Sequence, residues 1–202
     1  MIGKYSITAF ALAVSLTACQ SGPARTGDQA SVEGTVHLCS SCHGMNGRSV
    51  SPNFPILAGQ QQDYLETQLR AFRDHSRADP HAHTYMWGMA KNLDDKTIQG
   101  VAAHYAGQPL EPPRGGAKDP LGAKLYTTGA ESREVPACIG CHGEKAEGQG
   151  AIPRLAGQHS TYLAEQLGHF RSNARSNETM HMNALNLTDA EIAALAEYLS
   201  SL

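Results

Sequence analysis

The motif Cys-x-x-Cys-His occurs twice in this chain, at an offset of 99 positions; its copies are Cys39, Cys42 and His43, and then Cys138, Cys141 and His142. This spacing is typical of covalent haem c attachment. Two thiols reach the two vinyl carbons of one porphyrin, and the adjacent imidazole can bind the iron from one side. The duplication predicts two covalently bound haem c groups, with His43 and His142 as axial ligands, and a function in electron transfer.

Other uses of paired cysteines fit the sequence less well. A structural zinc site needs a second pair about 15–20 residues away, whereas 95 residues separate Cys42 from Cys138. A thioredoxin-like redox pair needs a βαβ setting, but the flanking residues show helical periods. Structural disulfides in an exported chain are the fairer alternative, although the two histidines would then be coincidental.

The N-terminus reads as an export signal of the lipoprotein type. Lys4 precedes an apolar run that ends at Ala18, too short to span a membrane as a mature helix, and Leu16-Thr17-Ala18-Cys19 resembles a bacterial lipoprotein cleavage box. We therefore expect residues 1–18 to be a signal peptide, Cys19 to carry the lipid and residues 19–29 to form a flexible tether. Removing Cys19 from the five cysteines leaves two complete haem pairs.

Length and charge set the remaining bounds. A chain of 202 residues allows two small domains, and a Pro- and Gly-rich stretch predicts a linker over residues 108–118 between domains at 30–107 and 119–202. Each half can bury only a modest apolar core, so a covalent porphyrin would supply its hydrophobic centre. The formal net charge of −3 and the lack of a basic face argue against nucleic-acid binding.

A longer internal repeat surrounds the motifs. Leu57-Ala58-Gly59-Gln60 returns 98 residues later as Leu155-Ala156-Gly157-Gln158, and the similarity continues through Arg73 and Arg171. In the first copy Leu65, Leu69 and Phe72 form one helical stripe. The repeat predicts an all-α fold with the same helices in both halves.

A closing helix is also expected in each half. Ile98, Val101, Ala102 and Tyr105 form an apolar face that Ile192, Leu195, Ala196 and Leu199 repeat at an offset of 94. Asp94 can cap the first of these helices, and Thr188 with Glu191 forms a capping box at the second. Upstream, Val32–Leu38 leads directly into Cys39, whereas residues 127–137 separate the helix at Leu121–Tyr126 from Cys138.

The sixth iron ligand decides between electron transfer and ligand chemistry, because a methionine closes the iron. Aligning the halves on their closing helices places Met86 opposite Met180, whereas Met89 and Met182 have no methionine counterpart. We predict Met86 and Met180 as the ligands, each in a segment that loops over a haem face. The alternatives are His81, His83 and His181. The other histidines outside the motifs are expected at the surface: His37, His75, His104, His159 and His169.

The sequence order Cys-x-x-Cys-His-Gly, Pro-x-Leu-Ala-Gly-Gln, a Tyr-Leu helix, a Met and a closing amphipathic helix occurs twice over residues 30–202. In this the chain resembles the dihaem cytochrome c4 family. The resemblance implies two tandem class I cytochrome c domains, each a small helical fold around a haem c with His and Met ligands. It also implies that the carbonyls of Pro55 and Pro153 orient the two haem-ligating histidines. Further candidates for binding propionates are Arg73, Arg171, Tyr64 and Tyr162.

The resemblance implies an electron carrier rather than an enzyme, relaying single electrons between redox partners on the periplasmic side of a bacterial membrane. The donor would be a protein such as a quinol-oxidising complex and the acceptor one such as a terminal oxidase. Gln20 after Cys19 favours the outer membrane as the site of the lipid anchor. Two alternatives remain open at this point: the cytochrome subunit of a dehydrogenase complex of the flavocytochrome type, and a dihaem peroxidase.

Overall fold

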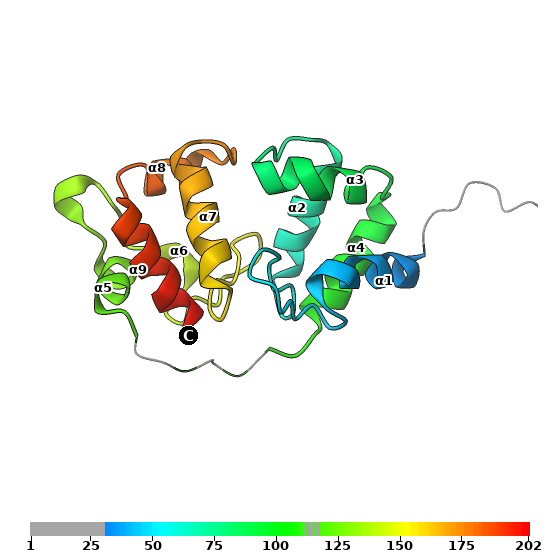
Figure 1. Cartoon of the computed structure of the whole chain (residues 1–202), viewed down its shortest axis with the longest axis horizontal. Coiled ribbons are helices and arrows are strands. Elements are labelled where there is room, and N and C mark those ends of the chain that lie inside the picture. The colour runs from blue at the N-terminus through cyan, green and yellow to red at the C-terminus, as the bar shows by residue number, and fades with distance from the viewer. Residues whose placement is uncertain (1–30, 111, 113–114, 116–117) are drawn as a thin grey trace, which may run out of the picture.

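The fold is all-helical, and it repeats one helical arrangement twice along the chain (Figure 1). A computed structural model describes residues 31–110, 112, 115 and 118–202, so the expected signal peptide, Cys19 and the tether lie outside the described residues. Within those residues there is no strand, only two isolated bridges. The elements are α1 (Val32–His43), α2 (Gln62–Arg73), η1 (Ala82–Met86), α3 (Trp87–Ala90), α4 (Asp95–Ala106), α5 (Pro120–Thr128), η2 (Glu131–Arg133), α6 (Ile139–His142), α7 (Ser160–Arg171), α8 (Glu178–Ala184) and α9 (Asp189–Ser200).

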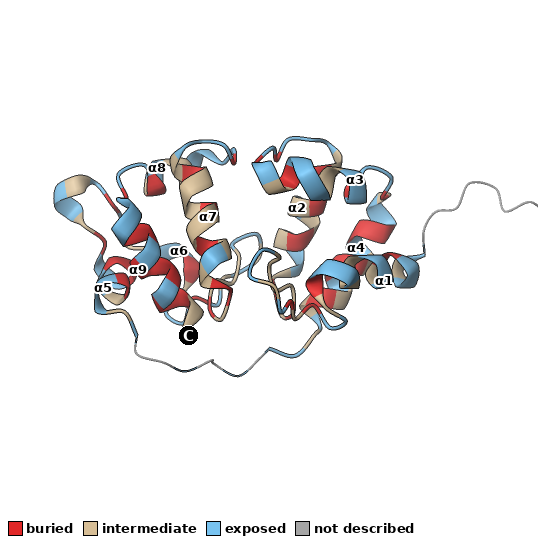
Figure 2. Cartoon of the chain, in the orientation of Figure 1, coloured by how far each residue is buried: buried red, intermediate tan, exposed pale blue. Residues whose placement is uncertain are grey.

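Each half packs its helices in the same way. In the first, α4 contacts both α1 and α2, and α2 contacts α3; in the second, α9 contacts both α5 and α7, and α7 contacts α8. Two separate clusters of buried side chains result, one in each half, and Figure 2 shows buried residues on the helices of both. The molecule is therefore two domains, each with its own core.

The expected helical faces are the buried ones. Leu65, Leu69 and Phe72 of α2 are buried, as are all four apolar positions predicted on each closing helix. Asp94 accepts a hydrogen bond from the Thr97 N–H, and Thr188 and Glu191 form the predicted capping box. These features are set by neighbours three or four residues away, which is why periodicity and capping patterns predict them.

The segment around the cysteine motif differs between the halves. In the first domain α1 runs without a break through the motif to His43. In the second, α5 ends at Thr128, the chain turns through η2, and only the short α6 carries Cys141 and His142. The extra loop predicted before Cys138 is present, and α5 extends two residues further than expected.

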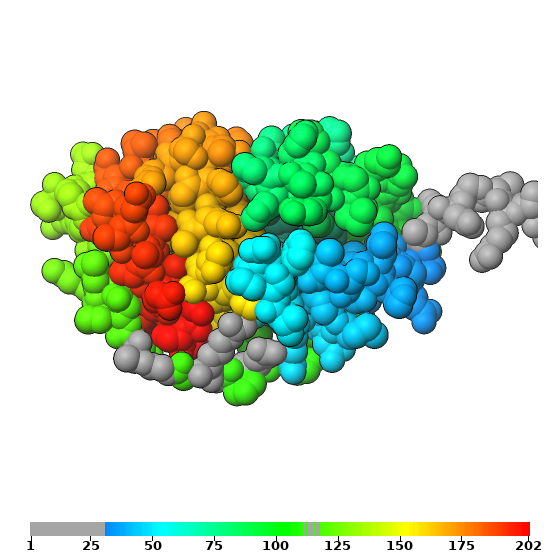
Figure 3. Space-filling model, in the orientation of Figure 1, coloured from blue at the N-terminus to red at the C-terminus, as the bar shows by residue number. Residues whose placement is uncertain are grey.

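The two domains lie side by side and touch along α2 and α7 and the loops beside them (Figures 1 and 3). The side chain of Gln60 binds the backbone of Arg154, with the amide donating to the carbonyl over 2.9 Å and the backbone N–H donating to Oε1 over 2.7 Å. Gln158 binds the backbone of Ile56 in the same way, over 2.9 and 2.8 Å. The two halves are thus joined by a reciprocal pair of glutamines from the repeated Leu-Ala-Gly-Gln segment.

Candidate haem sites

The two motif histidines are buried and point one ring nitrogen at a proline carbonyl. His43 and His142 are each 7% exposed. The Nδ1 of His43 lies 2.9 Å from the carbonyl oxygen of Pro55, and that of His142 lies 3.0 Å from the carbonyl of Pro153. With Nδ1–H donating to the carbonyl, Nε2 carries the free lone pair, which is the tautomer that binds iron.

Burial also tunes the protonation of these groups. Loss of solvent lowers the pKa of both His43 and His142 against the opposing effect of their proline carbonyls, so both imidazoles are neutral at neutral pH. Burial raises the pKa of Cys39, and raises that of Cys138 to about 11. The four motif cysteines form no disulfide with one another.

Each domain brings its cysteine and its predicted methionine to the same core. Cys39 and Met86 both pack against the buried cluster of the first domain, and Cys138 and Met180 both pack against that of the second. By contrast, Met89 is 48% exposed and Met182 is 58% exposed. Burial therefore distinguishes Met86 and Met180 from Met89 and Met182, as the alignment of the two halves also does. The assignment of Met86 and Met180 as iron ligands stays a prediction.

Both predicted ligands lie within helical segments rather than in open loops. Met86 ends η1, a π-helical segment, and Met180 lies inside α8. Four more residues lie between Asp79 and Met86 in the first half than between the equivalent Asn177 and Met180 in the second. The wider π-helical turn of η1 lies within this longer stretch. The longer stretch explains why the offset between equivalent residues of the two halves is 98 before it and 94 after it. Helical periodicity in the sequence does not give the reason for this change.

The rival histidine ligands have other contacts. His81 forms an ion-pair contact with Glu165 of the other domain, with Nδ1 and Oε2 3.4 Å apart. His83 packs against the ring of Trp87, and His181 Nδ1 lies 2.8 Å from the carbonyl oxygen of Phe170. Trp87, which also stacks on His75, uses its indole N–H to bind the carbonyl of Arg77.

One expectation about an individual side chain is corrected. His159 was expected at the surface but is buried, and its Nε2 lies 2.9 Å from the carbonyl oxygen of Ser49 across the domain interface. Arg73 and Arg171, the candidate propionate partners, bind the start of the closing helix in their own domains, and their role toward propionates stays a prediction. Each contacts a leucine carbonyl and an aspartate there, Leu93 with Asp95 and Leu187 with Asp189.

Beside the interface lies a polar cluster that sequence reasoning did not find. Arg175 donates to the hydroxyl of Tyr64 over 2.8 Å, linking α2 to the segment that follows α7. Burial raises the pKa of Tyr64, but Arg175 and then Arg77 oppose it, so that the pKa lies below its ordinary value. Arg175 lies 98 residues after Arg77, the same offset as between α2 and α7. This repetition was the sequence feature from which the cluster could have been predicted.

These residues fit two covalent haem c groups on the structure's own terms. Paired thiols, a neutral imidazole with a free Nε2 and a methionine in the same core are present in both halves. The buried amide nitrogen of Gln166 also has no hydrogen-bond partner among the described residues, which leaves a donor for a carboxylate-bearing group. No helix in the described part of the chain has the length and hydropathy needed to cross a bilayer.

Comparison with known proteins identifies the same arrangement elsewhere. The cytochrome c family matches residues 35–105 and again 121–202. Cytochrome c-552 of Acidithiobacillus ferridurans is 41% identical over 172 residues, covering 81% of this chain and 73% of the relative. Cytochrome c4 of Azotobacter vinelandii is 37% identical over 191 residues, covering 87% and 90%.

Two further similarities bear on electron transfer. A protein of Thiomonas intermedia named thiosulfate dehydrogenase electron acceptor is 35% identical over 173 residues, covering 81% of this chain and 77% of that protein. The solved structure of Acidithiobacillus ferrooxidans cytochrome c4 superposes with a TM-score of 0.77 at 40% identity, covering 81% of this chain and 98% of that one. This chain therefore belongs to the dihaem cytochrome c4 family of electron carriers and holds two covalent haem c groups in tandem cytochrome c domains.

Proposed function

We propose that this chain relays single electrons from a periplasmic or membrane donor, such as a quinol-oxidising complex, toward a terminal oxidase. One observation carries the proposal: the two domains present the same histidine, cysteine and methionine set, and the reciprocal glutamines hold those domains against each other. A relay needs two closed redox centres at a fixed separation. An enzyme acting on a small substrate would instead need one open iron.

The chain's own residues would keep both centres closed. When bound, each haem supplies one-electron chemistry between ferric and ferrous iron. His43 and His142, oriented by Pro55 and Pro153, would each bind one iron through Nε2, and we infer that Met86 and Met180 would bind the same two irons through sulfur. The surrounding apolar side chains exclude water, which limits the reorganisation that accompanies each electron.

A second candidate function is that of the cytochrome partner of a dehydrogenase. It is favoured by the relatives named as thiosulfate dehydrogenase electron acceptors. In this case the donor would be the dehydrogenase itself, and the chain would still transform no substrate. Rapid reduction by thiosulfate plus a thiosulfate dehydrogenase, with no reduction by thiosulfate alone, would support this donor over a quinol-oxidising complex.

We also propose that the protein works on the periplasmic side of a membrane, anchored by a lipid on Cys19. The support is the cleavage box at residues 16–19 and the polar stretch that follows it. Metabolic labelling with radioactive palmitate should mark the wild-type chain, and Cys19→Ser should abolish the label. Retention of label in that variant would exclude Cys19 as the anchor.

The test of the relay is a redox titration of the full haem-loaded chain with near-infrared detection. We expect two low-spin centres, uptake of two electrons per chain, a sulfur-to-iron charge-transfer band in the oxidised state and no response to carbon monoxide. Membranes that contain a terminal oxidase should then reoxidise the reduced protein. A high-spin centre that binds carbon monoxide would overturn the relay and favour peroxidase chemistry.

The chain offers a matched control for the methionine ligands. Met86→Ala and Met180→Ala should each remove half of the sulfur-to-iron band and open one iron to carbon monoxide. The neighbouring exposed residues provide Met89→Ala and Met182→Ala, which should leave the band intact. Loss of the band in a control variant instead would reassign the ligand in that domain.

A further inference from the structure

One contact between the domains brings together a histidine and a carboxylate that share no hydrogen bond. His81, directly before η1, and Glu165 of α7 place Nδ1 and Oε2 3.4 Å apart. Both atoms are buried, and neither has a hydrogen-bond partner among the described residues. The rest of each side chain is about one-third exposed, so a small ion has a short path from solvent to these atoms.

The distance between the two atoms suits a pair of ligands on one metal ion. Zn²⁺ binds an imidazole nitrogen at about 2.0–2.1 Å and a carboxylate oxygen at about 2.0–2.2 Å, almost always in tetrahedral geometry. Two corners of a tetrahedron of that size lie about 3.4 Å apart. The separation of His81 Nδ1 and Glu165 Oε2 therefore matches one edge of a zinc site.

The same helix offers a third ligand, His169. It follows Glu165 by four residues on α7, a spacing that places two side chains on one face of a helix. Burial lowers the pKa of His169, whereas Asp79 and Glu165 raise it and His81 and Arg77 lower it. His169 therefore lies within electrostatic reach of both members of the pair.

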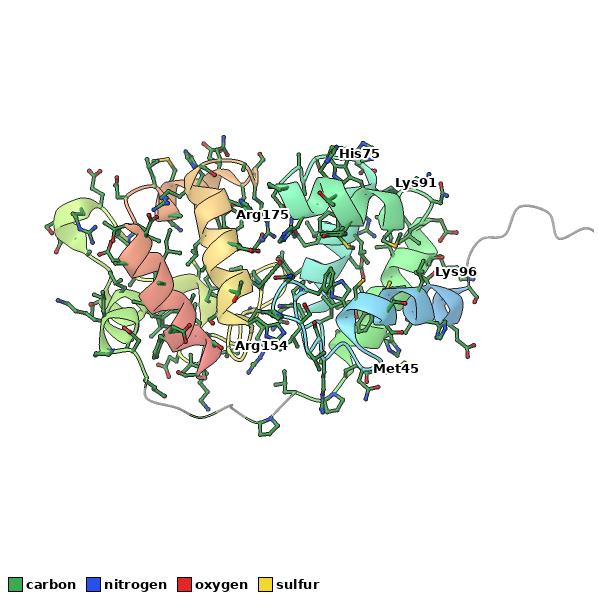
Figure 4. The ribbon with its side chains drawn as sticks, in the orientation of Figure 1. Met45, His75, Lys91, Lys96, Arg154 and Arg175 are labelled. Carbon is green, nitrogen blue, oxygen red and sulfur yellow. The ribbon has the colours of Figure 1, made fainter. Side chains whose placement is uncertain are left out.

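The fixed charges around these side chains nearly cancel. Asp79 is fully buried and accepts from Arg77 Nε over 2.7 Å, so these two charges offset each other. Arg175, which Figure 4 labels at the boundary between the domains, donates its backbone N–H to the His169 carbonyl over 3.1 Å. Its guanidinium opposes a cation, whereas the Glu165 carboxylate attracts one. An ion must therefore be held by its ligand bonds, which favours Zn²⁺ over Ca²⁺ and Mg²⁺ at imidazole nitrogens.

The repeat shows that this set of side chains is specific to one domain. At the 98-residue offset between α2 and α7, Glu165 and His169 correspond to Thr67 and Ala71 of the first domain. Zinc in proteins is bound by cysteine, histidine, aspartate and glutamate, so the α2 positions cannot form an equivalent site. The ligand set is thus a feature of α7 alone and not of the helix that both domains share.

We propose that His81, Glu165 and His169 bind one Zn²⁺ ion, with water as the fourth ligand, and that this ion ties the first domain to the second. No three metal-binding side chains among the described residues already surround one point, so His169 turns toward the other two when the ion binds. Zinc has no redox chemistry, and the ion therefore joins the domains without exchanging electrons with the haems.

The test is a calorimetric titration of the haem-loaded full chain with zinc chloride, after a chelator has removed bound metal. We expect one tight site per chain, and no comparable heat from Ca²⁺ or Mg²⁺. His81→Gln, Glu165→Gln and His169→Gln should each weaken the site by at least about tenfold, since loss of even an outer partner of a metal site costs about 10–100-fold in affinity.

Two other histidines of the first domain provide matched controls. His75 and His83 both contact the ring of Trp87, and His75→Gln and His83→Gln should leave the tight site unchanged. X-ray absorption at the zinc edge should show nitrogen and oxygen ligands at about 2.0 Å, with imidazole scattering and no sulfur. This measurement separates the proposed site from one made by cysteine or methionine.

Unfolding measures whether the ion joins the domains. Zinc should raise the thermal midpoint of the wild-type chain, a chelator should reverse the rise, and the three ligand variants should show none. Haem absorbance and the midpoint without zinc report whether each variant is folded. If Glu165→Gln does not fold, His169→Gln carries the test, because the hydrogen bonds of His169 within the described residues run through its main chain.

Three results would overturn the inference: no tight zinc site in the wild-type chain, an affinity unchanged in all three ligand variants, or sulfur among the zinc ligands. An equal loss of affinity in His83→Gln would do the same, because it would place the ion at the surface beside Trp87. His81 and Glu165 would then form an ion pair only.

Discussion

In each domain the first helix crosses the closing helix, α1 with α4 and α5 with α9. The glycine at the crossing lies on the closing helix in the first domain but on the first helix in the second domain. In the first domain the glycine is Gly100 of α4, and a Cβ there would lie 2.4 Å from the Val32 side chain of α1. In the second it is Gly122 of α5, where a Cβ would lie 2.0 Å from the Ala194 carbonyl oxygen of α9. Ala194 is the repeat counterpart of Gly100. The helices approach each other closely in both domains, although the glycine that allows this lies on a different helix in each.

Removing the thiols of one domain should have the largest effect on this comparison. Cys138→Ser/Cys141→Ser should reduce the haem content from two groups to one per chain, because each domain carries its own cysteine pair, one member of which packs against that domain's core. Cys39→Ser/Cys42→Ser should do the same for the other half. Haemochrome absorbance per polypeptide measures the ratio, and complete loss of haem from either variant would show that the domains do not load independently.

Substituting alanine for the glycine at each helix crossing should lower the unfolding free energy by different amounts in the two domains. Gly122→Ala should cost about 3 kcal/mol of unfolding free energy, since the new methyl group would meet backbone that cannot move alone. Gly100→Ala should cost about 1 kcal/mol, because it meets the side chain of Val32, which can change rotamer. Urea unfolding of the haem-loaded variants measures both. A larger loss in Gly100→Ala would reverse the ranking.

The reciprocal glutamines should behave alike. Gln60→Ala and Gln158→Ala each leave one backbone N–H and one carbonyl of the other domain without a partner, at a cost of about 2 kcal/mol. Calorimetry should show the single unfolding transition of the wild type broadening or splitting into two. Gln62→Ala, which removes an exposed glutamine at the start of α2, is the control and should change neither the midpoint nor the width.

Both closing helices should weaken in acid, because the hydrogen bond from the Thr97 N–H also lowers the pKa of Asp94, but only the second helix has a glutamate in its cap. A hydrogen bond from Arg133, helped by the Thr188 cap, lowers the pKa of Glu191 to about 2 from an ordinary 4.5. A carboxyl whose pKa is depressed by folding stabilises the fold fully above pH 4.5, and this stabilisation is lost as the pH falls toward 2.

Glu191→Gln should therefore cost about 1 kcal/mol at pH 6 and less at pH 3, as measured by urea unfolding. The first domain has Asp94 as its cap without the glutamate partner. Glu197→Gln, at an exposed position of α9, is the control and should have little effect at either pH. An equal cost of Glu191→Gln at both pH values would contradict the role of its charge.

Features set by local sequence were predictable, and features set across the interface were not. The buried stripes of α2, α4 and α9, the caps and the extra loop before Cys138 follow from spacing within about ten residues. His159 was placed wrongly because its acceptor, the carbonyl of Ser49, is 110 residues away in sequence. No periodicity reports a contact of that kind.

The residues of the haem sites also fall into those that local sequence predicts and those that it does not. The cysteine and histidine positions follow directly from the motif, because the chemistry of attachment fixes their spacing. The methionines needed the register between the halves, since the π-helical segment before Met86 alters the local count. The arginine cluster was missed because its members come from both domains, although the repetition of Arg77 as Arg175 was visible in the sequence.

Gln60 and Gln158 recognise the main chain of the opposite domain, not its side chains. Nearly any amino acid offers the same N–H and carbonyl to such a partner, and proline alone lacks the N–H. Mutations at the recognised positions therefore leave this joint in place. After a gene duplication, the two copies of such a domain can drift apart in charge and surface chemistry while they remain docked.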